Sequence, residues 1–252
     1  MRFASLGSGS KGNATLVEVE GRCLMIDCGF SMKETLKRLE RLGKTVDSVD
    51  AILVTHEHGD HISGVERLAR KYSIPVWASH GTASFFKGEG FELNCLNSHA
   101  AFEIKGFQIT PIAVPHDAKE PVQFVLSDGQ RKLGVLTDTG SITPFITESL
   151  SGCDALLLES NHDEQLLQQG VYPQSLKQRV AGRLGHLSNR QAAACLEAMD
   201  CSRLQHLVAA HLSDENNHRD LVSSVLSTAL NCEDDWIGFA DQATGFDWRT
   251  IS

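Results

Sequence analysis

The chain has 252 residues, of which 41% are hydrophobic and 22% charged, with a formal net charge of −9 and a pI near 5.6. This composition is typical of a globular protein, and the acidic balance argues against attraction of nucleic acid over the whole surface while allowing a local basic groove. No apolar run approaches the roughly 20 residues that cross a bilayer, and the start has no apolar export segment. Seven cysteines without a CxxC pair fit reduced thiols, so we expect a cytoplasmic protein without membrane association.

The first third of the chain alternates between predicted strands and helices. Two β-rich runs broken at Glu20-Gly21 predict a hairpin. Residues 33–43 predict an amphipathic helix that ends at Gly43. An apolar strand is expected over 48–56, a helix over 62–72 and another strand over 74–79.

The remainder is first rich in β structure and then alternates again. Two hairpins are expected, turning at Lys105-Gly106 and Asp128-Gly129. Further helices are predicted over 142–150, 176–184, 189–199 and 219–230, and strands over 154–160, 204–211 and 236–240. No linker or repeat marks a boundary. The pattern therefore predicts one α/β domain over residues 1–252, with two packed sheets and helices outside.

The stretch THEHGDH, residues 55–61, places His56, His58, Asp60 and His61 directly after a predicted strand. Two histidines spaced by two on extended backbone point the same way, and Gly59 lets the chain turn before the second pair. Imidazole and carboxylate ligands suit zinc, iron or manganese. A polar surface loop is the alternative, but it does not explain why an apolar strand leads into the motif. We therefore interpret the motif as half of a metal site.

A dinuclear site needs more ligands, and three candidates follow other predicted strands. They are His116 in AVPHDA, Asp138 in VLTDTG and His211 in LVAAHLS. Each alone is more often an ordinary turn residue. Together, and in this order, they favour a shared metal site.

Together with Asp27 in MIDCG, these residues follow the pattern of the metallo-β-lactamase-fold superfamily, which the sequence resembles over nearly its whole length. The resemblance implies an αββα sandwich of two mixed β-sheets with helices on the outer faces, and two divalent metal ions. One ion is expected on His56, His58 and His116, the other on Asp60, His61 and His211, with Asp138 bridging. Asp27 is expected to orient a ligand loop from outside the ligand set.

This fold hosts many reactions, so other residues must indicate the chemistry. The bridging residue is Asp138 rather than the cysteine typical of zinc β-lactamases, which argues against antibiotic hydrolysis. Glu159 follows a strand, and His186 precedes a helix capped by Ser188 and Gln191. This pair resembles the acid and histidine of transfer-RNA 3′-processing nucleases, where they assist proton transfer to the leaving oxygen. The alternative is that His186 only caps a helix and Glu159 faces solvent.

A narrower resemblance is to the YycJ-like (WalJ-like) branch, which is associated with 5′-to-3′ exonuclease activity on DNA. It rests on LGSGSKGNATLVE, THEHGDHISG, VPHDA, LLLESNHD, GHLSN and HLSDENN. We therefore expect a dinuclear metal-dependent hydrolase that cleaves phosphodiesters, with 5′-ended or single-stranded DNA as the preferred candidate. The metals would make hydroxide available as nucleophile near neutral pH. Asp60, His186 and Glu159 are the expected catalytic residues, and His162 is a candidate contact to metal or substrate.

Residues 165–196 contain no acidic residue, although the whole chain is acidic. Lys177, Arg179, Arg183 and Arg190 fall in this stretch, around His186. They could bind a phosphate backbone. An ordinary solvated helix face is an equally good explanation.

The stretch GSGSKGN, residues 7–13, is not a nucleotide P-loop, because Asn13-Ala14 stand where Lys and Ser or Thr would be required. We interpret it as a strand connection, with a role for Ser8 or Asn13 in orienting ligands or substrate as the alternative.

Three other functions stay open. They are a thioesterase resembling glyoxalase II, a phosphodiesterase acting on small molecules, and a metal-bearing regulatory protein without turnover. No glutathione-binding end is recognisable, and an inert descendant would have no reason to keep every ligand. The sequence also leaves open zinc against manganese, DNA against RNA, exo against endo action with its polarity, and the oligomeric state.

Overall fold

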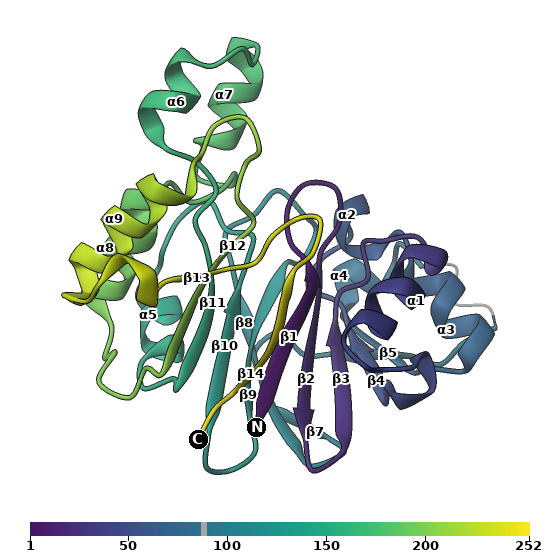
Figure 1. The fold of residues 1–252 in the computed structure, drawn as a ribbon. Coiled ribbons are helices and arrows are strands. Elements are labelled where there is room, and N and C mark those ends of the chain that lie inside the picture. Colours follow the sequence, from purple (N-terminus) through teal and green to yellow (C-terminus); the bar gives the residue numbers. More distant parts are fainter. Residues whose placement is uncertain (87–89) are drawn as a thin grey trace.

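In the computed structural model, which describes residues 1–86 and 90–252, two seven-stranded sheets lie face to face with helices on both outer sides (Figure 1). This is the expected αββα arrangement. The first sheet has the order β14-β1-β2-β3-β4-β5-β6. Its strands are β1 (Arg2–Gly7), β2 (Ala14–Val19), β3 (Arg22–Ile26), β4 (Ala51–Leu53), β5 (Val76–Ser79), β6 (Leu93–Leu96) and β14 (Phe246–Thr250).

The second sheet has the order β13-β12-β11-β10-β9-β8-β7. Its strands are β7 (Phe102–Ile104), β8 (Phe107–Ala113), β9 (Val122–Ser127), β10 (Lys132–Leu136), β11 (Ala155–Glu159), β12 (His206–Ala210) and β13 (Gly238–Phe239). Both sheets are mixed. Short connections join the antiparallel neighbours except β1 and β14, which come from the two ends of the chain. The parallel runs β3 to β6 and β10 to β13 are joined by longer connections that contain helices.

Helices cover the two outer faces. On the side of the first sheet lie α1 (Met32–Arg41), α2 (Gly59–Ile62), α3 (Val65–Tyr72), α4 (His80–Ala83) and the 3₁₀ turn Val46–Ser48. On the other side lie α5 (Pro144–Leu150), α8 (Asn189–Ala198), α9 (Arg219–Leu230) and the 3₁₀ turn Asp234–Trp236. The helices α6 (Glu164–Gln169) and α7 (Gln174–Val180) stand clear of the sandwich, at the end opposite both chain termini (Figure 1). Within the described ranges, no helix has the length and apolarity that crossing a membrane requires.

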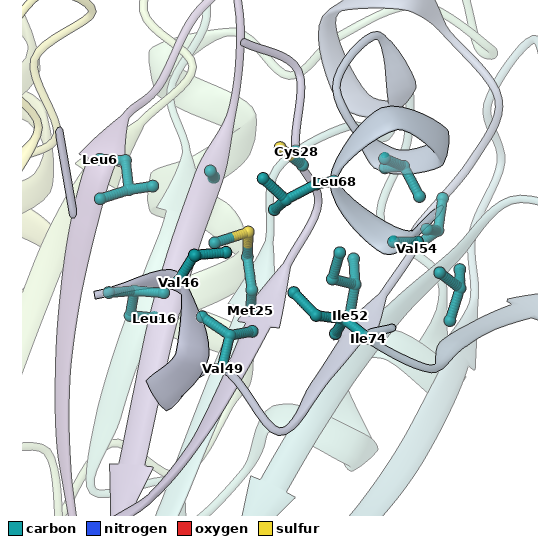
Figure 2. Packing of buried hydrophobic residues seen from close by; sticks show 14 of the residues in the cluster. Leu6, Leu16, Met25, Cys28, Val46, Val49, Ile52, Val54, Leu68 and Ile74 are labelled. Carbon is teal, nitrogen blue, oxygen red and sulfur yellow. The ribbon is translucent and has the colours of Figure 1, made fainter. Parts of the chain in front are cut away.

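The strands divide their side chains between two apolar layers because successive residues of a strand point to opposite faces. In β3, Leu24 and Ile26 pack between the sheets, whereas Met25 packs outward under the helices. In β4, Leu53 faces the other sheet, and Ile52 faces α3. Figure 2 shows Met25 and Ile52 in this outer layer, next to Leu68 of α3. A third layer lies between the second sheet and α5, α8 and α9.

The three predicted hairpins form where the sequence indicated. Gly21, Gly106 and Gly129 sit in their turns with φ of +81°, +90° and +91°, a conformation that favours glycine. Gly43, with φ of +68°, follows Leu42, the C-cap residue of α1, as expected of a helix stop.

The expected helix over 62–72 is instead a single turn, α2, followed by α3 from Val65. The chain bends at Gly64, where a Cβ atom would lie 2.2 Å from the Phe30 carbonyl oxygen. The expected helix over 176–184 likewise begins earlier, at Gln174, and ends at Val180.

Ten strands run toward the same edge of the sandwich. In the first sheet they are β1, β3, β4, β5 and β6, and in the second they are β8, β10, β11, β12 and β13. The residues that follow these strands therefore meet at one place, and this edge carries the metal-binding motif.

Candidate metal centre

Four overlapping groups of histidine and carboxylate side chains lie at this edge, each close enough to hold a metal ion. All seven ligands expected from the sequence belong to at least one group. The groups are His56, His58 and His116; Asp60, His61 and His211; His56, His61 and Asp138; and Asp138, Glu159, His186 and His211. The first two groups are the two ligand sets expected from the sequence, and Asp138 lies between them.

The three histidines of the first group point their nitrogens at one another. His58 Nδ1 lies 3.1 Å from His56 Nε2 and 3.3 Å from His116 Nε2. The other nitrogen of each ring contacts an oxygen: Thr55 Oγ1 at 3.0 Å for His56, the Asp117 carbonyl at 3.2 Å for His58 and the Gly185 carbonyl at 3.0 Å for His116. The two carbonyls accept an N–H from their histidines, which leaves the inward nitrogens unprotonated and able to bind a cation.

Asp27 orients His61 in the second group. It directly follows β3 and has a φ of +60°. Its carboxylate accepts hydrogen bonds from the Thr55 amide at 2.8 Å and the Thr55 hydroxyl at 2.8 Å, and it lies 2.7 Å from His61 Nδ1. His61 is fully buried, and its Nε2 faces Asp60 at 3.5 Å and Asp138 at 3.1 Å. This is the supporting position expected for Asp27.

Asp138 is the central buried carboxylate. Burial by itself would raise its pKa, but His211, His61 and His56 outweigh that effect and lower the pKa well below the usual value. Its Oδ2 is 3.1 Å from His61 Nε2 but accepts no hydrogen bond from the described residues. The contact has the length of a hydrogen bond but not its orientation. A buried, negatively charged oxygen that accepts no hydrogen bond is stabilised by a bound cation.

The residues fit a bound metal in two further respects. Ligand nitrogens on one tetrahedral zinc lie about 3.3 Å apart when each Zn–N bond is about 2.0 Å. The inward nitrogens of the first group have this spacing. Burial also lowers the pKa of His56 and His116, which favours the neutral form that a metal ligand needs.

The loop of residues 8–13 connects β1 to β2, as we expected, and it also contacts the site, as the alternative interpretation held. Ser8 follows β1, and its buried hydroxyl accepts a hydrogen bond from the His211 amide at 3.0 Å. It donates to Asn13 Oδ1 at 3.0 Å. Asn13 Nδ2 in turn lies 3.3 Å from Asp60 Oδ2 and 3.1 Å from His61 Nε2. The loop therefore holds ligands from both sheets, and His211 keeps a left-handed φ of +54° there.

Glu159 and His186 form a pair beside Asp138. Glu159 is fully buried, so it does not face solvent. Its Oε2 accepts hydrogen bonds from the amides of Thr139 at 2.9 Å and Leu187 at 3.3 Å. Its Oε1 lies 2.7 Å from His186 Nδ1. Burial disfavours the imidazolium of His186, but the charge and hydrogen bond of Glu159 prevail and raise its pKa. Ser188 and Gln191 form the expected capping box just after His186.

The remaining candidate residues, His162 and the four basic residues, lie at different places in the structure. His162 is buried, but it lies outside the metal-binding groups found in the described part of the chain. It lines a different cavity of about 300 Å³ with residues of α6 and α7, including Lys177. Arg179 lies close to the metal ligands, with its Nε 2.8 Å from Asp117 Oδ2. Arg183 is exposed after α7, and Arg190 is exposed on α8. The four basic residues are thus spread over two helices and the loop between them.

A cleft of about 180 Å³ opens beside these ligands. His186, His211 and Asn161 line it together with α7 and the residues before it. Asp117, which was not predicted from the sequence, contacts both a histidine of the first group and α7. Its carbonyl contacts His58, and its carboxylate pairs with Arg179. Its only sequence signal is that it directly follows a predicted ligand.

Comparison with known proteins agrees with this geometry. The model of the beta-lactamase superfamily domain matches residues 22–211. The chain belongs to this superfamily. It is 34% identical to exodeoxyribonuclease YycJ of Bacillus anthracis, over 91% of this chain and 89% of that protein. It is 31% identical to exodeoxyribonuclease WalJ of Streptococcus pneumoniae, over 94% and 91%.

The solved structure of the metallo-beta-lactamase fold protein YhfI from Bacillus subtilis covers 98% of both chains with a TM-score of 0.77 and 17% identity, which supports the fold. The chain is therefore a metal-dependent hydrolase of the metallo-β-lactamase fold, in the family that contains YycJ and WalJ.

Proposed function

We propose that the protein is an exonuclease that hydrolyses phosphodiester bonds from the 5′ end of DNA, using two divalent metal ions. The observation that carries this proposal is the Glu159–His186 pair, held 2.7 Å apart beside the metal ligands. When a phosphodiester bond is hydrolysed, the leaving group departs as an alkoxide that needs a proton. A histidine that is hydrogen-bonded to a carboxylate can supply this proton. Similarity over the whole chain to exodeoxyribonucleases supports DNA as the substrate.

The two ligand sets would hold zinc or manganese, with His56, His58 and His116 on one ion and Asp60, His61 and His211 on the other. Asp138 would lie between them. When bound, the ions supply a nucleophilic water of near-neutral pKa and offset the negative charge of the phosphate. The carboxylate of Asp60 adds ligand charge to the second set, so its loss should abolish hydrolysis.

The protein groups then divide the remaining tasks. His186 donates its Nδ1 hydrogen to Glu159, which directs Nε2 away from the carboxylate, and its side chain is 22% exposed. Nε2 is therefore free to protonate the leaving oxygen. Arg179 on the rim of the cleft, with Lys177 and Arg183 nearby in the chain, would contact the phosphate backbone.

The test uses purified, metal-analysed protein with zinc or manganese and single-stranded DNA labelled separately at each end. We expect stepwise, metal-dependent loss from the 5′ end, and at least a hundred-fold slower loss for His61→Ala. The matched control is His99→Ala, because His99 is exposed on a loop away from the ligand groups.

A protein that binds both metals and cleaves no DNA would refute the nuclease proposal. Turnover of small phosphodiesters would then identify a phosphodiesterase, and turnover of a glutathione thioester would identify a thioesterase. Absence of any turnover would favour a regulatory protein.

A further inference from the structure

The segment from Tyr172 to Val180 forms a wall of the metal cleft without being part of the apolar core. None of the residues of α7 is buried. Leu176, Arg179 and Val180 line the cleft, spaced at three and four residues along one side of the helix. Tyr172 precedes the helix and extends this face by one turn. The opposite side of α7, with Gln174, Lys177 and Gln178, lines the separate cavity near His162.

Tyr172 is an aromatic side chain in this wall that has no partner. Among the described residues it makes no ring contact and no side-chain hydrogen bond. It precedes Pro173, the N-cap residue of α7 with a φ of −55°, and a proline favours an extended backbone at the residue before it. His186 and His211 line the same cleft. A half-buried aromatic ring thus shares the cleft with the catalytic pair, and its hydroxyl makes no hydrogen bond within the described residues.

The cleft around Tyr172 combines apolar side chains with an ion pair. Leu176, Val180 and Leu212 line it, and Arg179, whose side chain is 62% exposed, pairs there with Asp117 at 2.8 Å. Residues 165–196 carry no acidic group. An apolar platform beside a cation is the combination that binds unpaired nucleotides, because a base stacks on the ring while the cation meets the phosphate.

We propose that Tyr172, with Leu176 and Val180, forms a nucleobase subsite that receives an unpaired base next to the phosphodiester to be cleaved. The inference rests on the proposed nuclease function and specifies its substrate as a single-stranded end. The cleft, at about 180 Å³, is smaller than the 300 Å³ or more of a typical drug-sized ligand site. A volume of this size accommodates one base. Stacking uses the face that every base has, so the subsite would tolerate any sequence.

The test compares a normal single-stranded oligonucleotide with versions that carry one abasic residue on either side of the terminal phosphodiester. We expect the wild-type protein to cleave one abasic version with kcat/KM lowered about ten-fold, within the range for loss of one base–aromatic stack. Tyr172→Ala should cleave the normal DNA about ten-fold more slowly and no longer distinguish the two substrates. Tyr172→Phe should behave as wild type, since the ring is kept.

The matched control is Val171→Ala, because Val171 is 86% exposed and does not line the cleft. It should leave the discrimination unchanged. If Tyr172→Ala discriminates against the abasic end as strongly as wild type, the subsite does not exist.

Binding of deoxynucleoside 5′-monophosphates to the metal-loaded protein, measured by calorimetry, separates this inference from the proposed function. Suppose that the wild-type protein cleaves no DNA but binds these nucleotides at least five-fold more tightly than Tyr172→Ala does. The subsite is then supported, and the nuclease proposal is refuted. Equal binding by the two proteins would overturn the subsite.

Discussion

Replacing Asp27 with asparagine should weaken one metal site by changing which nitrogen of His61 carries the proton. The substitution preserves side-chain size, and asparagine tolerates the left-handed φ of +60° that residue 27 adopts. It also keeps one oxygen to accept the hydrogen bond from the Thr55 amide. The folded backbone should therefore persist. What changes is the group that faces the Thr55 hydroxyl and His61 Nδ1, which becomes an amide NH₂.

An NH₂ group can only donate, so Nδ1 of His61 must become an acceptor in the variant. The ring proton then moves to Nε2, the nitrogen that faces Asp60 and Asp138. A protonated Nε2 cannot bind a metal. The missing hydrogen bond to a charged carboxylate contributes about 1.5–3 kcal/mol, and removal of such an outer partner typically costs about 10–100-fold in metal affinity or activity. We expect a loss of this size at the set containing Asp60, His61 and His211.

The measurement is a metal titration against a competing chelator, with the bound metal counted by elemental analysis. Asp27→Asn should retain tight binding of one ion and bind the second about 10–100-fold more weakly, with a parallel loss of kcat. Asp154→Asn is the matched control. Asp154 is also buried and accepts a backbone N–H, from Lys132 at 2.8 Å, but it precedes β11 at the opposite end from Glu159. Equal metal affinity in Asp27→Asn and wild type would refute the tautomer argument.

Two further predictions concern the proton donor and the rim of the cleft. A general acid must be protonated, so the rate falls as pH rises through its pKa. Because Glu159 raises the pKa of His186, Glu159→Gln should shift the alkaline limb of the kcat–pH profile to lower pH, and an unchanged limb would exclude His186 as the acid. Arg179→Glu should weaken DNA binding at low salt and flatten the plot of log affinity against log salt by about 0.7 for each phosphate that the protein no longer neutralises. Arg190→Glu on α8 should weaken DNA binding and flatten this plot by a smaller amount. Equal effects of the two substitutions would argue against a specific role of Arg179 at the rim of the cleft.

The parts that the sequence predicted are those set by local patterns. Glycine turns defined the three hairpins, and short apolar or β-rich runs defined the buried strands. Because parallel strands end at one edge, polar residues after successive strands could be grouped into a site before their distances were known. The resemblance of these residues to a family then assigned His116, Asp138 and His211 to the site, although each lies far from THEHGDH in the chain.

The parts that were not predicted depend on contacts between distant segments. β14 lies at the edge of its sheet, and its residues are charged or only partly buried, so it carries no clear apolar pattern. Ser8 and Asn13 resemble any polar turn until the end of β1 is placed beside His211, 203 residues from Ser8. The ion pair between Asp117 and Arg179 spans 62 residues. Neither residue type nor spacing marks such partners in a single sequence.

The division of the ligands between the two sheets explains why the site lies where it does. His56, His58, Asp60 and His61 follow β4 of the first sheet, whereas His116, Asp138 and His211 follow strands of the second. Between the sheets the contacts are apolar, as at Leu53. Within a few residues the same strands end in imidazoles and carboxylates, because no facing strand covers their ends. A cation at this edge would therefore join the sheets where the apolar core stops, and its binding would add to the stability of the folded chain.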